Sequence, residues 1–451
     1  MVVQHNLRAM NSNRMLGITQ GTLSKSTEKL SSGYKVNRAA DDAAGLSISE
    51  KMRKQIRGLT QASLNAEDGI SAVQTAEGAL TEVHDMLQRM NELAVKAANG
   101  TNSLSDRQTI QDEVDQLLTE IDRVAETTKF NETYLLKGDT DKVTKYLAAH
   151  DAGIEGTLTQ GATNATFTMA KLEVGDTITI AGTEYHISCD NTTQSGKIGN
   201  AKTGEQVTID GITYTVNTAS SNADKFEFTV SDLQAKIDKN DKSVVTYNGK
   251  TYYGDKVQDK TVTNTTGAYT KIQNELALAS SIGADESKQA TVATAAAKGT
   301  DKYEFAITKA TVDVREDINF SLHVGADADM TNKIGVKIGS LDTKGLGIQG
   351  LNVLDFSGAA ATYAIDSIAD AVAKISAQRS LLGAVQNRLD HTINNLDNVV
   401  ENTTAAESQI RDTDMAREMV NYSNNNILAQ AGQSMLAQSN QANQGVLSLL
   451  G

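Results

Sequence analysis

The N-terminal part of the chain carries a heptad pattern of apolar residues. Two series of small or apolar residues each recur every seven positions, in alternating steps of three and four: Leu59, Ala66, Val73, Leu80, Leu87 and Ala94, and Ala62, Gly69, Ala76, Val83, Met90 and Ala97. This pattern places one apolar stripe along a helix, as in the seam of a coiled coil. A helix from about Leu46 to Ala98 would be roughly 80 Å long. No compact domain buries such a helix by itself.

A second helix is predicted directly after the first. Residues 99–102, Asn-Gly-Thr-Asn, interrupt the helical pattern, and Ser103 with Asp106 resembles the capping box that begins a helix. The seam continues at helical spacing through Ile110, Val114, Leu117, Ile121 and Val124. We therefore expect this helix to fold back on the first and to form a helical hairpin.

The C-terminal part predicts a matching set of helices. One apolar series is spaced by seven: Ile368, Ile375, Leu382, Leu389 and Leu396. A second stripe lies near the end of the chain: Leu428, Ala431, Met435, Ala442, Val446 and Leu449. The charged residues among residues 1–40 are mainly basic, whereas those between Glu407 and Glu418 are mainly acidic. Opposite charges favour pairing of the two chain ends, although exposed pairs contribute little each.

The middle of the chain predicts strands and turns. Of the 19 aromatic residues, 14 lie between residues 141 and 359, and three segments read as strand, tight turn, strand: Ile180–Tyr185, Ile209–Tyr214 and Tyr247–Tyr252. Short helices are predicted near residues 231–239 and 268–281. We expect one or two small α+β domains, inserted into an otherwise helical chain.

Composition excludes several classes of function. The chain of 451 residues has no proline, which permits very long helices, and its net charge of −14 argues against a nucleic-acid partner. The single cysteine, Cys189, and six scattered histidines offer no metal site, and we expect no cofactor. No apolar run is long enough to span a bilayer, and the first 30 residues lack the apolar region of a cleaved signal peptide. The adjacent Asp41 and Asp42 are interpreted as a polar junction between two helices.

Motifs at both ends resemble bacterial flagellin. On the N-terminal side these are Leu30–Asn37, Asp41–Gly45, Arg57–Ser63 and Leu87–Val95; on the C-terminal side they are Gly383–Leu389, Ala437–Gln441 and Val446–Leu450. The resemblance covers roughly residues 1–140 and 316–451, and these motifs in this order are highly specific. The middle of the chain matches no family that we can name.

The resemblance implies a structural role and a domain division. Residues 1–42 and 406–451 would form terminal helices of an inner coiled-coil core, and residues 43–142 and 312–405 a helical rod domain with a small β-hairpin portion. Residues 143–311 would form a variable, surface-exposed insertion. The chain would be exported unfolded by the flagellar type III apparatus, which explains secretion without a cleaved signal, and would polymerise into the extracellular flagellum. Implied partners are other copies, an export chaperone at the C-terminal helix, and the filament cap and hook-junction proteins.

Two groups of site residues are predicted. In flagellins recognised by Toll-like receptor 5, an arginine and a leucine on the long helix and a glutamate on the next form the core contact, and Arg89, Leu93 and Glu113 match them. Asn91 stands where many receptor-binding members carry another arginine. Assembly of the filament core is assigned to apolar residues of the terminal helices: Leu23, Leu30, Leu428, Met435, Val446 and Leu449.

Three alternative roles can be distinguished. A hook-filament junction protein shares the terminal heptads, but the matches through residues 37–45 and 87–95 favour flagellin. An adhesin is compatible with the tyrosine-bearing hairpins of the middle region, and its Ser/Thr-rich stretches could accept glycans. An enzyme is not expected, because residues 141–359 contain neither a zinc-protease helix motif nor a Gly-x-Ser-x-Gly elbow.

Overall fold

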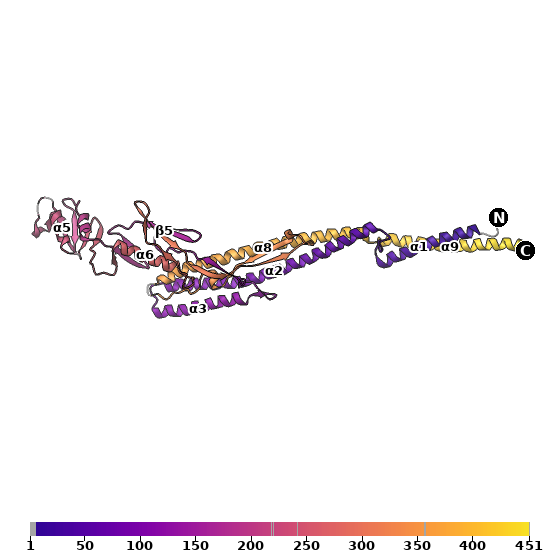
Figure 1. Cartoon of the computed structure of the whole chain (residues 1–451), viewed down its shortest axis with the longest axis horizontal. Helices are drawn as coiled ribbons and strands as arrows, with labels where there is room; N and C mark the ends of the chain where they lie inside the picture. The colour runs from indigo at the N-terminus through magenta and orange to yellow at the C-terminus, as the bar shows by residue number, and fades with distance from the viewer. Residues whose placement is uncertain (1–5, 218, 220, 241, 356–357, 451) are drawn as a thin grey trace. The chain divides into compact units, whose positions relative to one another are not determined.

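The computed structural model describes residues 6–217, 219, 221–240, 242–355 and 358–450, and the side chains of all these except residues 443–450 (Figure 1). The chain forms two compact units. Unit 1 consists of Met1–Ser71, Ser321–Gly335 and Val385–Gly451; unit 2 consists of Ala72–Phe320 and Val336–Ala384. The predicted fold class, long helices at both ends and an α+β region between them, is confirmed. The three-domain division inferred from the resemblance stays a prediction.

Four long helices account for most of the terminal regions. They are α1 (Leu7–Ser32), α2 (Ala43–Ala98), α8 (Ala359–Arg411) and α9 (Met415–Leu450). Helices α2 and α8 contribute residues to both units, whereas α1 and α9 belong to unit 1 alone. Such lengths are possible because proline, which interrupts a helix by removing a backbone donor, is absent from the sequence.

The heptad residues of α2 and α8 form the buried side of these helices. In α2 every member of the two series except Leu59 is buried, and in α8 the residues from Ile368 to Leu396 at sevenfold spacing are at most 7% exposed. A larger residue has no room at Gly69, because a Cβ there would lie 2.2 Å from Leu322 Cδ1. A hairpin of two strands, β18 (Ile318–His323) and β19 (Lys333–Ile338), packs against α2 at this glycine.

Helix α3 (Leu104–Thr127) begins at the predicted capping box. The Ser103 hydroxyl accepts from the Asp106 backbone N–H, and the Asp106 carboxylate accepts in return from the Ser103 N–H. Its apolar positions divide into buried Ile110, Val114 and Ile121 and half-buried Leu117 and Val124. The predicted helical hairpin is confirmed by contacts between α3 and the end of α2.

The rest of unit 2 consists of short strands and helices. The strands are β1 (Lys129–Phe130), β2 (Thr133–Tyr134), β3 (Lys142–Tyr146), β4 (Thr157–Gln160), β5 (Asn164–Ala170), β6 (Thr177–Ile180), β7 (Thr183–Ile187), β8 (Gln206–Ile209), β9 (Ile212–Val216), β10 (Glu227–Phe228), β11 (Val244–Tyr247), β12 (Lys250–Tyr253), β13 (Val262–Thr263), β14 (Thr291–Val292), β15 (Ala296–Ala297), β16 (Lys302–Thr308) and β17 (Thr311–Arg315). The helices are α4 (Asn191–Lys197), α5 (Val230–Asp238), α6 (Thr265–Ala279) and α7 (Thr343–Leu346), with a 3-10 turn at Ala223–Lys225. Another 3-10 turn, Met330–Asn332, lies in unit 1 between β18 and β19.

The three predicted hairpins are confirmed as β6–β7, β8–β9 and β11–β12, all antiparallel. Among the described residues the larger sheets have the orders β10-β9-β8-β11-β12, β13-β7-β6 and β14-β16-β5-β4. Two pairings, β10 with β9 and β13 with β7, are parallel. The turn motifs did not predict these pairings, because a parallel neighbour arrives through a longer connection that leaves no local pattern.

The middle region contains two separate apolar cores. One lies around β5, β16 and α6, with Phe167 and Phe305 fully buried, and it includes Tyr363 from α8. The Tyr363 hydroxyl donates to Glu275 Oε2 of α6 at 2.9 Å. The other core lies around β8, β9, β11 and α5, with Val207, Leu233 and Val245 fully buried.

Candidate assembly and recognition surfaces

Helices α1 and α9 pair antiparallel along one heptad seam in unit 1. The buried and half-buried positions recur every seven residues: Ala9, Leu16, Leu23 and Leu30 with Ser12, Thr19 and Ser26 on α1, and Tyr422, Ala429 and Leu436 with Asn425, Gly432 and Ser439 on α9. A Cβ at Gly432 would lie 3.3 Å from Leu16 Cδ1, so glycine allows the two helices to approach closely there. Many seam residues are small or polar, which makes this pairing weaker than one built from leucine alone.

The predicted charge attraction between the two ends does not appear as ion pairs. No salt bridge joins α1 to α9 among their described side chains. The contacts are instead backbone and amide hydrogen bonds: Asn6 Nδ2 donates to the Ser439 carbonyl at 3.2 Å, and at the opposite end of the pair Thr413 N donates to the Gly33 carbonyl at 2.9 Å. Most basic side chains of α1 therefore remain in solvent, where pairing gains little.

A second face of these helices carries large apolar side chains in solvent. Leu7, Met10 and Ile18 on α1 are 68%, 64% and 57% exposed, and Leu428 and Met435 on α9 are 57% and 58% exposed. The predicted assembly residues thus divide into two groups. Leu23 and Leu30 lie half-buried on the α1–α9 seam, whereas Leu428 and Met435 are more than half exposed. The side chains of Val446 and Leu449 lie outside those that the structure describes.

The connections from α1 to α2 and from α8 to α9 meet at Arg411. Its guanidinium donates to Glu50 Oε1 at 2.8 Å and lies 4.7 Å from the centre of the Tyr34 ring. The backbone of Tyr34 bridges to Asp412. The Asp41–Asp42 pair has the predicted junction role: Asp41 Oδ2 accepts from the Arg38 N–H, and Asp42 Oδ1 accepts from Gly45 N at 2.8 Å, at the start of α2.

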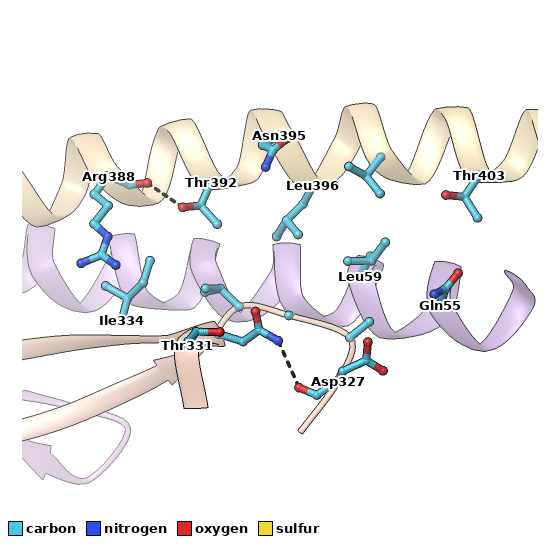
Figure 2. A pocket seen from close by; sticks show the side chains of 15 residues that line it. Gln55, Leu59, Asp327, Thr331, Ile334, Arg388, Thr392, Asn395, Leu396 and Thr403 are labelled. Carbon is cyan, nitrogen blue, oxygen red and sulfur yellow. Dashed lines mark hydrogen bonds between the residues drawn. The ribbon is translucent and has the colours of Figure 1, made fainter. Parts of the chain in front are cut away.

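A shallow groove of about 490 Å³ lies in unit 1, between α2, α8 and the β18–β19 connection. Figure 2 shows Leu59 and Leu396 pointing into it from the two helices, with Asp327 and Thr331 on the connection. Its lining includes threonine hydroxyls and one charged side chain of each sign, Asp327 and Arg388. The groove therefore combines neutral and charged polar groups with the apolar side chains of Leu59 and Leu396.

The predicted receptor residues lie together on the α2–α3 hairpin. Arg89 Nε donates to Glu113 Oε1 at 2.9 Å, and its Nη1 donates to Glu92 Oε2 at 3.1 Å. The hydrogen bond that Arg89 donates to Glu113, followed by the one it donates to Glu92, raises the pKa of the Arg89 guanidinium. Arg89 and Glu113 are about half exposed, whereas Leu93 is only 2% exposed. Arg89 and Glu113 are therefore accessible to a partner protein, and Leu93 supports the helix beneath them.

Two buried polar residues of α3 were missed by the sequence analysis. Arg107, 2% exposed, donates to the carbonyls of Ala97 at 2.9 Å, Asn99 at 3.3 Å and Asp355. Gln111 donates to the Leu351 carbonyl at 2.9 Å and accepts from the Val353 N–H at 2.7 Å, as a neighbouring strand would. One available indication was the position of Arg107 in the first turns of a helix, where the helix dipole disfavours a positive charge.

Other classes of site find no support in the described part of the chain. No group of three or more His, Cys, Asp or Glu residues there is arranged to hold a metal ion. None of the helices that the structure describes has both the length and the apolar character needed to cross a membrane. The free Cys189 is buried, and burial raises the pKa of its thiol to about 11.

Comparison with known proteins agrees with the architecture. Residues 3–141 match the model of the bacterial flagellin N-terminal helical region, and residues 365–450 match that of the C-terminal helical region. A flagellin of Clostridium tyrobutyricum is 38% identical over 98% of this chain and 100% of its own length. A flagellin of Halalkalibacterium halodurans is 34% identical over the full length of both chains. The solved structure of FliC from Burkholderia pseudomallei is 19% identical and covers 71% of this chain and 99% of that one, with a TM-score of only 0.26, too low to compare the folds.

The comparisons extend over the whole chain, including the middle region, which carried no resemblance by itself. Flagellins are structural subunits that polymerise into the extracellular flagellar filament, and they are not enzymes. The chain belongs to the bacterial flagellin family.

Proposed function

We propose that the exposed apolar faces of α1 and α9 build the core of the filament by packing against other copies of the chain. The observation that carries this proposal is the exposure of Leu428 and Met435, which are more than half exposed although they lie on a regular apolar stripe. Such a stripe on a single subunit marks an interaction surface. In a helical polymer the same face meets a different patch on the next subunit, so the contacts continue along the assembly.

The energy of this contact comes from burial. Each large apolar side chain that passes from half exposed to buried contributes about 1 kcal/mol, and each subunit offers at least five such side chains on α1 and α9. Leu23 and Leu30 have a different proposed part, since they hold α1 to α9 and so keep the outer faces of both helices in register. We assign Val446 and Leu449 to the same apolar stripe as Leu428 by their spacing.

We also propose export in an unfolded state through the flagellar type III apparatus. The small and polar seam residues Ser12, Ser26 and Gly432 support this, because a pairing with few large apolar contacts is easily separated before export. An apolar stripe that is exposed on α9 of the subunit would need a bound partner in the cell to prevent premature association. An export chaperone on α9 would be that partner, and the hook-junction and filament-cap proteins would meet the same faces at the two ends of the filament.

Deletion of residues 419–451 is the direct test of the assembly proposal. We expect the full chain to form filaments under assembly conditions and the truncated chain to form none, because deletion removes one partner of the seam and the whole α9 stripe. Electron microscopy of both samples at equal concentration measures the outcome. Circular dichroism should show that α2, α3 and α8 remain helical in the truncated chain. Filaments of normal length from the truncated chain would contradict the proposal.

Recognition by Toll-like receptor 5 is a second proposed function, supported by the geometry around Arg89. Its guanidinium is held by Glu113 and Glu92, so both partners are ordered before a receptor arrives, which lowers the entropy cost of binding. Arginine is also common at the centre of interfaces. Because Leu93 is only 2% exposed, we propose that it supports this surface and does not itself contact the receptor.

Replacing Arg89 by alanine should weaken binding of the receptor ectodomain about 30-fold, the effect of losing roughly 2 kcal/mol at a hot spot. Arg123→Ala is a matched control, because Arg123 is also an exposed arginine of this hairpin and forms an ion pair with Glu120. Surface plasmon resonance with the full chain measures both variants. Equal affinities for the Arg89 and Arg123 variants would remove Arg89 from the proposed site.

A further inference from the structure

The middle region contains two copies of one structural module, one nested inside the other. The outer module consists of β6, β7, β13 and α6, and the inner module of β8, β9, β10 and α5, which lie in the chain between β7 and β13. Each begins with a hairpin whose turn has two residues. A short third strand then pairs in parallel with the second hairpin strand, and the chain continues into a capped helix.

Backbone hydrogen bonds place the two modules in register. His186 N donates to the Thr261 carbonyl at 2.8 Å, as Thr215 N donates to the Phe226 carbonyl at 2.9 Å. Two residues later, Ser188 N donates to Thr263 O, as Asn217 N donates to Phe228 O. The hairpin positions of the outer module therefore correspond to those of the inner module 29 residues later, and Thr261 corresponds to Phe226.

Side chains follow the same correspondence. Lys271 lies over the Tyr185 ring, with its Nζ 4.8 Å from the ring centre, and Lys236 lies over the Tyr214 ring at 5.1 Å. Each lysine occupies the same position in the helix of its module. This correspondence allows one module to serve as an internal reference for what the fold itself requires.

Two positions differ in a way that the fold does not require. Where the outer module has Thr183 and Thr261, the inner module has Ile212 and Phe226, which are 48% and 52% exposed. The third hairpin, β11–β12, has Lys250 at the position of Ile212. Because polar residues occupy these positions in the other copies, burial within the module does not explain the apolar pair.

The backbone at Phe226 points to the same conclusion. Its φ is +56°, a left-handed conformation that glycine or asparagine adopts more readily than phenylalanine. Strain of this kind at an exposed residue tends to accompany function. The Phe226 ring lies 6.1 Å from the Tyr214 ring, and Ile212 lies two residues before Tyr214 on the same face of β9, so both exposed side chains neighbour Tyr214.

We propose that Ile212 and Phe226, the Ile212–Phe226 patch, form a contact between neighbouring copies of this chain within one filament. Two half-exposed side chains cannot supply the roughly 800 Å² per partner that a free protein complex needs. A patch this small is effective where the partner is already held close, because tethering gives a high effective concentration. Assembled copies of the chain meet that condition, and so the inference rests on the filament assembly proposed above.

Site-specific photo-crosslinking in filaments of the full chain tests this inference. A benzophenone-bearing residue is placed at position 212 in one sample and at the corresponding position 183 in the other, and electron microscopy first shows whether each sample has formed filaments. The probe at 212 should give crosslinked dimers at about ten times the yield of the probe at 183, and none in unassembled subunits at the same concentration. Equal yields from the two probes in well-formed filaments would overturn the inference and leave the proposed assembly intact. Absence of filaments would overturn both.

A paired set of variants gives the second measurement. Ile212→Thr with Phe226→Asn should lower the temperature of filament disassembly while the free subunit melts as before, since asparagine tolerates the left-handed backbone. Thr183→Ser with Thr261→Ser is the matched control and should change neither temperature. To separate contacts within a filament from contacts between filaments, two sets of preformed filaments, each made of subunits with a different tag, are mixed before irradiation. Crosslinked dimers that contain both tags would place the contact between filaments and overturn the inference.

Discussion

Replacing Leu428 and Met435 together by glutamate is expected to raise the critical concentration for polymerisation by about a thousandfold or more. Both side chains are more than half exposed in the subunit, so the change should leave the α1–α9 pair folded. In the proposed filament they become buried. The double change removes about 1 kcal/mol of apolar burial at each position and places a carboxylate in an apolar contact, which costs several kcal/mol more. A total above about 4 kcal/mol corresponds to three decades in concentration.

The control for this experiment changes two polar residues of the same helix. Gln433 and Asn440 are exposed and are also separated by seven residues, so Gln433→Glu with Asn440→Glu adds the same charge on a different face of α9. We expect this variant to polymerise far more readily than the Leu428 and Met435 variant. Sedimentation of filaments over a concentration series measures both. If the two variants had the same critical concentration, charge on the tail would be the cause and the apolar stripe would not be.

The second large effect is expected for stability. Arg107→Ala should lower the free energy of unfolding of the α2–α3 hairpin by about 2 kcal/mol, because it removes a donor from one buried and two partly buried carbonyl groups, and a buried group left unsatisfied costs about 1 kcal/mol or more. These carbonyls belong to Ala97 and Asn99 at the end of α2 and to Asp355 in the segment before α8. Loss of Arg107 therefore removes the hydrogen bonds that join α3 to the end of α2 and to the segment before α8.

Arg123→Ala provides the reference for the Arg107 variant. Arg123 is on the same helix, but its side chain is 59% exposed and its partner Glu120 is only one turn away. Exposed pairs of this kind contribute less than about 1 kcal/mol. Urea unfolding followed by circular dichroism compares the two variants. A loss of stability at Arg107 no greater than that at Arg123 would show that water replaces the guanidinium at these carbonyls without penalty.

The sites separate into residues that a sequence pattern can reveal and residues that it cannot. Arg89 and Glu113 were identified by resemblance to a family motif. In the structure they lie on neighbouring helices, with Arg89 Nε 2.9 Å from Glu113 Oε1. The resemblance could not reveal that Leu93 is buried, because exposure depends on which helix covers that side of α2. Gln111 carries no motif at all. Its side-chain amide donates to the Leu351 carbonyl and accepts from the Val353 N–H, about 240 positions away in the sequence. Such contacts exist only in the folded chain.

The middle region shows the same division. The hairpins were predicted because their turn residues act locally: Asp210-Gly211 and Asn248-Gly249 take the positive φ values that a tight turn requires. The parallel strands β10 and β13 have two residues each and meet partners reached through long connections, so no local preference identifies them. The correspondence of Thr261 with Phe226 likewise became visible only through backbone hydrogen bonds.

By itself the sequence determined the long helices, their apolar stripes, the cap at Ser103 and the family, because helical periodicity, turn chemistry and motifs are properties of neighbouring residues. Only the tertiary structure decided which stripe of α9 meets α1. The seam runs through Ala429 and Gly432, and the more apolar face with Leu428 and Met435 is left to solvent. Small residues let two helices approach closely, so the less apolar face packs within the subunit. The choice depends on the shape of both surfaces together, and a pattern read along one chain does not contain it.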